Sequence, residues 1–470
     1  MSSSSRTGPV AGLSNRGPAV PSGAQAAVPR SAAYRAIWRW HFFAGLLSAP
    51  FLILLAVTGA IYLFHAEIEH TAFRYRSVVR DPGTPSLAAG ALLDRAVASV
   101  PGAAAMSFID PDTRTASAVA TVAAPEGKLR IYLDPYTGRV LDTIRADREF
   151  GYLVKKIHSL ELFGTAANRL IEAVAGFAMV LVVTGIYLWW PRGQDGGVVS
   201  LRGTPRQRLW WRDVHAVTGV AAGGLIFFLA LSGMPWSGVW GAKLNEVAGR
   251  LGVGTPPEVF DAVPASTVPT GAVLGGAGWV VEAAPLPRSG PGGAAAPIGL
   301  DRAMQVARGA GMAPGFEMAL PDGPTGVYTA GHYFGDLSKE RTIHIDQYSG
   351  APLVDIGFDR YGAVGKAIEF GINVHQGLQW GLINQLVMLA TCVAVVLASA
   401  SALVMWWKRR PAGRVGVPPS PADARVYRGL WIAAVAFGVA FPVTGAAILL
   451  MLALDLLVIR TVPPLRRAFS

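Results

Sequence analysis

The chain has 470 residues, of which 52% are hydrophobic and 15% are charged, and its formal net charge is +11. This composition is too apolar for an ordinary soluble enzyme and too charged for a protein buried wholly in a bilayer. It predicts an integral membrane protein with sizeable domains outside the membrane. The single cysteine, Cys392, excludes an intramolecular disulfide, a cysteine-rich metal site and a covalently attached c-type haem.

Apolar runs divide the chain from its N-terminus onward. The first 30 residues are rich in Ser, Gly, Ala and Pro, which predicts a disordered tail rather than a cleaved signal peptide. Runs long enough for the roughly 20 residues that a bilayer requires follow at about 42–64, 169–190, 216–236 and 383–407. A fifth run, at about 430–459, contains Gly438, Pro442 and Gly445, which predicts one kinked helix rather than a hairpin.

Arginines and lysines cluster before the first run, between the second and third, and after the fourth. Such clusters tend to stay in the cytoplasm, so the two long connecting regions are expected on the outer, periplasm-like side. This topology explains most of the positive charge, and no nucleic acid is expected as a partner. In the first half, the expected order is a tail at 1–34, a first span at 35–65, an outside module at 66–157, a second span at 158–191 and a basic loop at 192–212. In the second half, it is a third span at 213–240, a second outside module at 241–374, a fourth span at 375–408 and a basic loop at 409–429. A fifth span with the C-terminal tail is expected at 430–470.

The two outside modules have the pattern of small α+β units. In the first, residues 87–99 have an amphipathic helical pattern, and the segments "ASAVATVA", "KLRIYLD" and "RVLDTI" alternate as strands do. The segment "DPYTG", from Asp134 to Gly138, predicts a turn, and so does its counterpart from Asp346 to Gly350. In each turn, the Asp side chain is expected to accept hydrogen bonds from the turn backbone, and the Gly is expected to take a positive φ. The Gly-, Pro- and Ala-rich stretch at 263–298 predicts a loop or insertion in the second module.

An internal repeat relates the two halves of the chain. One constant offset, applied without a gap, aligns His41 with His215, Gly45 with Gly219, and Thr58–Gly59 with Ser232–Gly233. A second, larger offset aligns His158 with His375, and Trp189–Trp190 with Trp406–Trp407. The chain is therefore predicted to be two parallel copies of a unit made of a span, an outside module and a span, related by an axis along the membrane normal.

This repeat places two pairs of histidines at matched depths. His41 and His215 are expected near the cytoplasmic face, and His158 and His375 near the outer face. Facing imidazoles inside an apolar bundle favour bis-histidine ligation of the iron of two b-type haems. Gly45 and Gly219 lie one helical turn after their histidines and are expected to leave room for a flat macrocycle. For any single histidine, the alternative is an interfacial side chain in the headgroup zone.

The segment "HAEIEH" contains His65, Glu67, Glu69 and His70 at the end of the first span. It has no counterpart in the second repeat and lacks the HExxH spacing of zinc proteases, so a solvated charge cluster is preferred to a metal site. His65 is kept as a minor candidate ligand, because 24 helical residues beyond His41 span about 36 Å and would bring it to the outer face. The tryptophan pairs are interpreted as interfacial anchors.

The D-x-Y-[ST]-G turns resemble PepSY domains. Their placement between HxxxG helices and the "TGIYLWWPR" and "ALVMWWKRR" helices resembles the PepSY-associated transmembrane family, over about residues 35–410. The resemblance implies a bacterial inner-membrane protein, similar to ferric-siderophore reductases that bind b-type haem, with His41, His158, His215 and His375 as the haem ligands.

The expected function is transmembrane electron transfer through two b-type haems to a periplasmic ferric chelate or siderophore, as an oxidoreductase step in iron acquisition. No GxGxxG or flavin signature is present, so the expected donor is a quinol or a separate cytoplasmic reductase. One alternative is a peptide-binding or protease-regulating PepSY protein without redox activity. Another is a haem or iron transporter in which the histidines mark a path.

Overall fold

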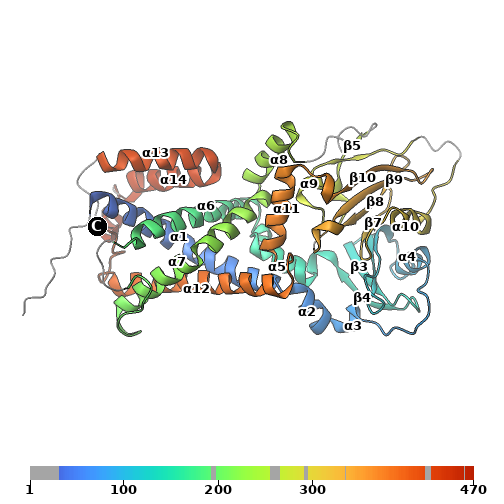
Figure 1. The fold of residues 1–470 in the computed structure, drawn as a ribbon, viewed down its shortest axis with the longest axis horizontal. Helices are drawn as coiled ribbons and strands as arrows, with labels where there is room; N and C mark the ends of the chain where they lie inside the picture. Colours follow the sequence, from blue (N-terminus) through green and yellow to red (C-terminus); the bar gives the residue numbers. More distant parts are fainter. Residues whose placement is uncertain are drawn as a thin grey trace, which may run out of the picture.

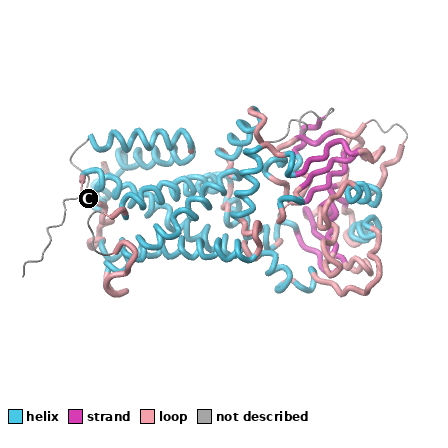
Figure 2. The backbone as a smooth tube through the Cα atoms, in the orientation of Figure 1, coloured by secondary structure: helices cyan, strands magenta, loops and turns pink. Residues whose placement is uncertain are grey.

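The computed structural model consists of a helical bundle joined end-on to a β-sheet domain (Figures 1 and 2). It describes residues 31–191, 197–254, 265–290, 295–333, 335–418, 425–459 and 461–469. Within these residues, five helices are long and apolar enough to cross a membrane. Most of the expected N-terminal tail and parts of both basic loops, at 192–196 and 419–424, lie outside the described residues.

Four long helices form the bundle: α1 (Ala32–Tyr62), α6 (Thr165–Trp189), α7 (Arg208–Gly233) and α12 (Leu382–Arg409). Both α1 and α7 pack against α6 and α12, so α1 and α7 lie diagonally opposite each other. The 31 residues of α1 extend about 46 Å, which exceeds the roughly 30 Å hydrocarbon core. The helix nevertheless ends at Tyr62, and His65 begins a separate helix, α2 (His65–Ala72), followed by α3 (Arg74–Ser77).

The C-terminal apolar run is a helical hairpin, so the prediction of one kinked helix is wrong. Helices α13 (Arg425–Ala440) and α14 (Pro442–Leu454) lie side by side in Figure 1. A Cβ on Gly438 would lie 3.1 Å from the Cα of Gly445, whereas seven residues of continuous helix rise about 10 Å. Pro442 lacks the N–H that would continue the helix, and the two glycines allow close packing. The hairpin packs on α1 and α6, and a π-helical turn (Asp455–Ile459) and α15 (Pro463–Phe469) follow it.

Both outside modules contribute to one eight-stranded antiparallel sheet with the order β10-β9-β8-β7-β1-β2-β3-β4. The first half contains β1 (Ala104–Ile109), β2 (Ala118–Ala124), β3 (Gly127–Leu133) and β4 (Val140–Arg145). The second half contains β7 (Glu317–Ala319), β8 (Val327–His332), β9 (Arg341–Asp346) and β10 (Pro352–Gly357). Strands β1 and β7 join the halves, with Phe108 opposite Met318.

The sheet has a different cover on each face. Helices α4 (Ala89–Ala98) and α10 (Leu300–Gly309) cover the face away from the bundle, over a core that includes the fully buried Phe108, Phe316 and Met318. On the other face, α5 (Phe150–His158) and α11 (Ala363–His375) lead back toward the bundle. Short 3-10 turns occur at Ala146–Arg148, Glu161–Phe163, Met234–Trp236, Thr270–Ala272, Leu337–Lys339 and Phe358–Arg360.

The first module follows its sequence pattern closely. Helix α4 occupies the expected amphipathic stretch, and β2, β3 and β4 occupy the three alternating segments. In the turn after β3, Asp134 accepts a hydrogen bond from the Tyr136 N–H at 2.9 Å, and Gly138 has φ 69°. Asp346 and Gly350 repeat this arrangement after β9, with a 3.0 Å bond from the Tyr348 N–H and φ 72°. These aspartates and glycines therefore have the turn roles expected of them.

Part of the expected loop in the second module is ordered structure. Residues 265–290 contain β5 (Ala265–Pro269), α9 (Trp279–Glu282) and β6 (Pro285–Pro287), after helix α8 (Trp240–Arg250). Helix α9 is buried in a second hydrophobic cluster with β10 and α11. Of the two alternatives, a loop is wrong for these residues, whereas an insertion fits them, because no such strands precede α4 among the described residues of the first half. The apolar "WVV" of α9 supplies the core of this insertion, and the surrounding Gly and Pro obscure it in the sequence. Residues 263–264 and 291–294 of the expected loop lie outside the described residues.

Candidate metal centre in the helical bundle

The bundle brings the first pair of histidines together across its axis. His41 lies on α1 and His215 on α7, and their ring centroids are 6.1 Å apart with the planes 83° to each other. A metal–nitrogen bond of about 2.0 Å on each side of an ion places two imidazole centroids about 6 Å apart. The spacing of His41 and His215 therefore suits one ion held between the two rings.

The second pair lies at the end of the bundle that adjoins the sheet domain (Figure 1). His158 is the last residue of α5, which packs on α1, and His375 is the last residue of α11, which packs on α7. The His158 ring lies beside Gly59 of α1, and the His375 ring lies beside Gly233 of α7. All four predicted ligands thus come to the diagonal helices α1 and α7, one pair toward each end.

Each histidine directs its Nδ1 atom at an oxygen of a neighbouring helix. The four contacts are His41 to Thr184 Oγ1 at 2.8 Å, His158 to Thr58 Oγ1 at 2.9 Å, His375 to Ser232 Oγ at 2.9 Å, and His215 to the carbonyl oxygen of Ala398 at 2.9 Å. These contacts fix the orientation of all four rings.

The hydrogen bonds also determine where the imidazole proton lies. Thr58, Thr184 and Ser232 each donate their hydroxyl proton to the carbonyl four residues earlier in their own helix, at 2.7, 2.6 and 2.7 Å. Their oxygens must therefore accept from Nδ1–H, and a backbone carbonyl, the partner of His215, can only accept. All four rings are consequently held in the tautomer that leaves a bare nitrogen, Nε2, for a metal.

The glycine after each hydroxyl residue makes room for the ring. A Cβ on Gly59 would lie 3.5 Å from Cε1 of His158, and one on Gly185 would lie 3.3 Å from Cε1 of His41. At Gly233 the distance to Cε1 of His375 would be 3.4 Å. The repeat had aligned two of these Thr/Ser–Gly pairs, but pairing them with the histidines required the structure. The aligned dipeptides were the available sequence signal.

The two glycines expected to accommodate a macrocycle differ in their surroundings. A Cβ on Gly219 would meet no atom within 4 Å, so this position faces open space. A Cβ on Gly45 would lie 3.6 Å from Cδ2 of Leu181, which is an ordinary contact. Open space therefore lies next to the helix of His215, while the helix of His41 is packed at the corresponding position.

The "HAEIEH" segment does not converge on one point. His65 stacks on Tyr62 with centroids 4.4 Å apart, and its Nδ1 lies 2.7 Å from the Tyr62 carbonyl. Glu69 pairs with Arg76, Glu67 accepts from Gln385, and His70 is exposed. Across the described ranges, no three His, Cys, Asp or Glu side chains form a group that could hold a metal ion. His65 does lie beside α5, the helix of His158, with its Cδ2 3.6 Å from a Cβ built on Gly151.

The loops after α6 and α12 are attached to the bundle in the same way in both halves. The indole N–H groups of Trp189 and Trp406 each donate to the carbonyl nine residues later, at 2.8 Å. One member of each tryptophan pair thus closes a loop, besides its expected place at the interface. Asp213 is fully buried and lies two residues before His215. It accepts hydrogen bonds from Arg202 and Arg212 at 2.7 to 3.1 Å, which fixes the first part of α7.

The match to a known family covers most of the chain. The PepSY-associated TM region matches residues 38–409, which contain all four histidines, the bundle and the sheet. No curated protein matches the chain. The matched region ends before the C-terminal hairpin. The protein is therefore a membrane protein that belongs to the family of the PepSY-associated TM region.

Proposed function

We propose that the protein carries electrons across a bacterial inner membrane through two b-type haems and reduces a periplasmic ferric chelate, such as a siderophore. His41 and His215 would hold the inner haem, and His158 and His375 the outer one. The observation that supports this most strongly is the common tautomer of the four histidines, because a bis-histidine site needs a bare nitrogen on each ring. The 6.1 Å centroid spacing of the inner pair fits the same group.

The bound haems would supply reversible one-electron chemistry, and residues of this chain would hold the haems in place. His41 and Thr58, the partner of His158, are both on α1, about 26 Å apart along the helix. The two sites would therefore be stacked near opposite membrane faces. Outward movement of an electron from a negative interior is favoured by about 2.3 kcal/mol per 100 mV. A quinol or a separate cytoplasmic reductase would supply the electron.

The proposed acceptor follows from coordination chemistry. Hard oxygen ligands hold trivalent iron more tightly than divalent iron, so one electron weakens the chelate and frees the metal. The periplasmic location of the sheet domain, expected from the positive-inside tendency, would place this step outside the cytoplasm. Release of iron there would make the protein part of iron acquisition.

Electron transfer can be tested in sealed vesicles. The purified protein is reconstituted with a water-soluble reductant that cannot cross the membrane trapped inside, and with a ferric chelate and a colorimetric ferrous trap that cannot cross the membrane outside. We expect colour to form outside, and we expect a variant with both His41→Ala and His375→Ala to give only the rate of protein-free vesicles. Equal rates with the variant and the unchanged protein would rule out the proposed function.

The hydroxyl groups that orient the histidines give a separate prediction. Thr58→Val keeps the side-chain shape but removes the oxygen that accepts from His158 Nδ1. Loss of such an orienting partner typically lowers metal affinity about 10- to 100-fold, so the outer haem should transfer faster to an acceptor protein such as apomyoglobin. The matched control is Thr71→Val, since Thr71 also donates to the carbonyl four residues earlier but is exposed on α2. Identical transfer rates for the two variants would contradict the positioning role.

One observation supports the peptide-binding alternative. A cavity of about 360 Å³ lies on the face of the sheet away from the bundle, between residues of α4 and α10, with Asp110 and Arg308 in its lining. Strands β1 and β7 close the sheet between the two modules, so this cavity is separated from the bundle by the sheet. A ligand bound there would contact both modules without contacting the histidines.

A further inference from the structure

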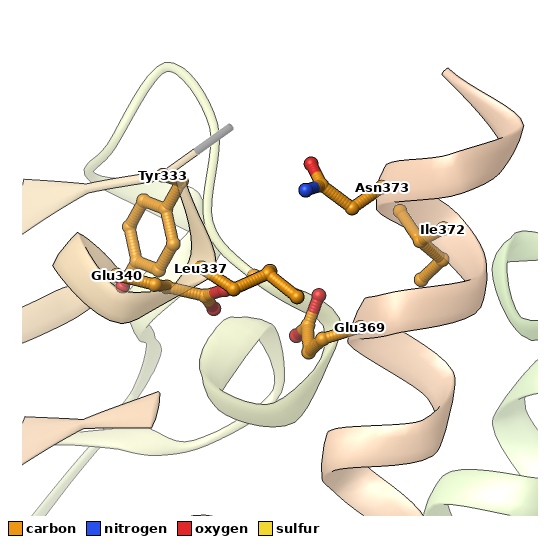
Figure 3. Close-up of a pocket in the computed structure, with 7 residues that line it drawn as sticks. Tyr333, Leu337, Glu340, Glu369, Ile372 and Asn373 are labelled. Carbon is orange, nitrogen blue, oxygen red and sulfur yellow. The ribbon is translucent and has the colours of Figure 1, made fainter. Parts of the chain in front are cut away.

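A small pocket lies between the second half of the sheet and α11, the helix that ends in His375. Figure 3 shows the carboxylates of Glu340 and Glu369 directed into this pocket, with Tyr333 and Asn373 also in its lining. Its volume is about 10 Å³, which is close to the minimum for one water molecule. The pocket is therefore a polar site within the protein rather than a binding site for a larger molecule.

The two carboxylates lie against the same backbone atom. A Cβ on Gly278 would lie 2.3 Å from Oε1 of Glu340 and 2.8 Å from Oε1 of Glu369. Both side chains are only 4% exposed. Any larger residue at Gly278 would displace the pair, so this glycine is what lets the two acids share one site.

Neutral donors, rather than cations, surround the pair. Tyr361 donates its hydroxyl to Oε1 of Glu340 at 3.0 Å, and the Val280 N–H donates to Oε1 of Glu369 at 3.0 Å. The other titratable groups that face it are Tyr333, at the end of β8, and Glu282, on α9, and neither is a cation. Within the described part of the chain, no lysine or arginine forms an ion pair with either acid.

Two buried carboxylates this close cannot both be ionised without a cation. Burial raises the pKa of Glu340, and the negative charge of Glu369 raises it further. Burial likewise raises the pKa of Glu369, and the charge of Glu282 adds to the effect. The pair therefore retains a proton at pH values where an exposed glutamate, with a pKa of about 4.3, is ionised.

The duplicated scaffold does not require this pair. The turns of Asp134 and Asp346 align the halves of the sheet, and Lys128 then stands in the first half where Glu340 stands in the second. The aligned histidines His158 and His375 place Tyr152 where the second half has Glu369. The first half thus forms the same fold without the acids, so the costly burial of two carboxylates serves something other than the fold.

We propose that Glu340 and Glu369 form a shared proton site that takes up one proton when the outer haem is reduced. This inference rests on the proposed function. Glu369 and His375 both lie on α11, about 9 Å apart along the helix. At this distance in a buried environment, a change of charge at the haem held by His375 would alter the proton affinity of Glu369. When one electron from the quinol reaches the outer haem, one proton from the outside water joins the singly protonated pair. When the electron passes to the ferric chelate, the proton returns to the water.

The test is a redox titration of one haem at several pH values. His41→Ala removes the inner haem from the measurement, and the midpoint potential of the outer haem is followed from pH 6 to pH 9. We expect the potential to fall as the pH rises, because proton uptake favours reduction only where the pair can still accept a proton. Adding Glu340→Gln and Glu369→Gln should flatten this dependence, because glutamine has the shape of the neutral acid and cannot titrate. Glu246→Gln, on the exposed surface of α8, is the matched control and should leave the slope unchanged.

A second measurement does not depend on haem. The infrared carbonyl band of a protonated carboxylic acid should persist at neutral pH in haem-free protein and disappear in the double glutamine variant. A pH slope that is the same with and without the two acids, or no such band, overturns the shared proton site. Absence of haem from the unchanged protein with the band present would instead overturn the proposed function and the coupling while leaving the shared proton in place.

Discussion

We expect His41→Ala to carry one haem per chain and the unchanged protein to carry two. The imidazole of His41 would supply one of the two nitrogens proposed for the inner site, and alanine would supply none. His375→Ala should likewise remove the outer haem and keep the inner one. Haem is counted by pyridine haemochrome, and reduced-minus-oxidised spectra distinguish the two low-spin centres. The control is His70→Ala, an exposed histidine on α2 whose Nδ1 contacts only the carbonyl of Ala66 in its own helix.

Other outcomes of that count are equally informative. If the unchanged protein is colourless and does not take up added haem, the electron-transfer proposal is ruled out and the peptide-binding alternative is favoured. Loss of haem in the His70→Ala control would show that the assay reports general damage. Retention of two haems by His41→Ala would mean that the inner pair is not the ligand set.

Arg76→Met should lower the free energy of unfolding by about 3 kcal/mol or more. The Arg76 side chain is 4% exposed and lies 2.9 Å from Glu69 and 3.4 Å from Asp142. Its guanidinium also lies 4.4 Å from the centre of the Phe73 ring. Methionine fills much of the same volume but leaves the two carboxylates facing each other without a cation. The midpoint of denaturant unfolding of the purified protein measures the change.

The matched control for this prediction is Arg114→Met. Arg114 also pairs with one carboxylate through two bonds, at 2.6 and 2.7 Å from Asp81, but its side chain is 57% exposed. Exposed ion pairs contribute about 0 to 1 kcal/mol, so this variant should unfold close to the unchanged protein. Similar losses of unfolding free energy in the two variants would show that burial does not determine how much the ion pairs of Arg76 stabilise the fold.

The approach of His41 to His215 could be predicted from sequence because a repeat places them at the same depth. Duplicated histidines at a constant offset fix their depth even when the partner helices are unknown. The repeat also aligned Thr58 with Ser232, but it did not assign them to His158 and His375 as hydrogen-bond partners. For the inner pair the repeat fails, because it aligns Thr184 with Ser401, whereas His215 bonds the carbonyl of Ala398. A backbone oxygen has no side-chain signature, and one helix face cannot be matched to another from a single sequence.

Two features of the fold escaped prediction for related reasons. Hydropathy identifies the apolar run after residue 425 but does not distinguish a bend at Pro442 from a full reversal, which depends on the contact between Gly438 and Gly445. The pairing of β1 with β7 joins short segments from opposite halves of the chain, and no local pattern links them. The acid pair could not be predicted either. Glu340 and Glu369 are unusual because they are buried, and no local sequence pattern indicates that a glutamate is buried.

The pairing of β1 with β7 has a mechanical consequence for the whole molecule. Alternating-access carriers work by rocking one repeat against the other. Here main-chain hydrogen bonds between β1 and β7 join the sheet halves of the two repeats, and rocking would have to break these bonds. This pairing weighs against a carrier whose two repeats must move apart at the sheet, whereas the proposed electron transfer requires no such movement.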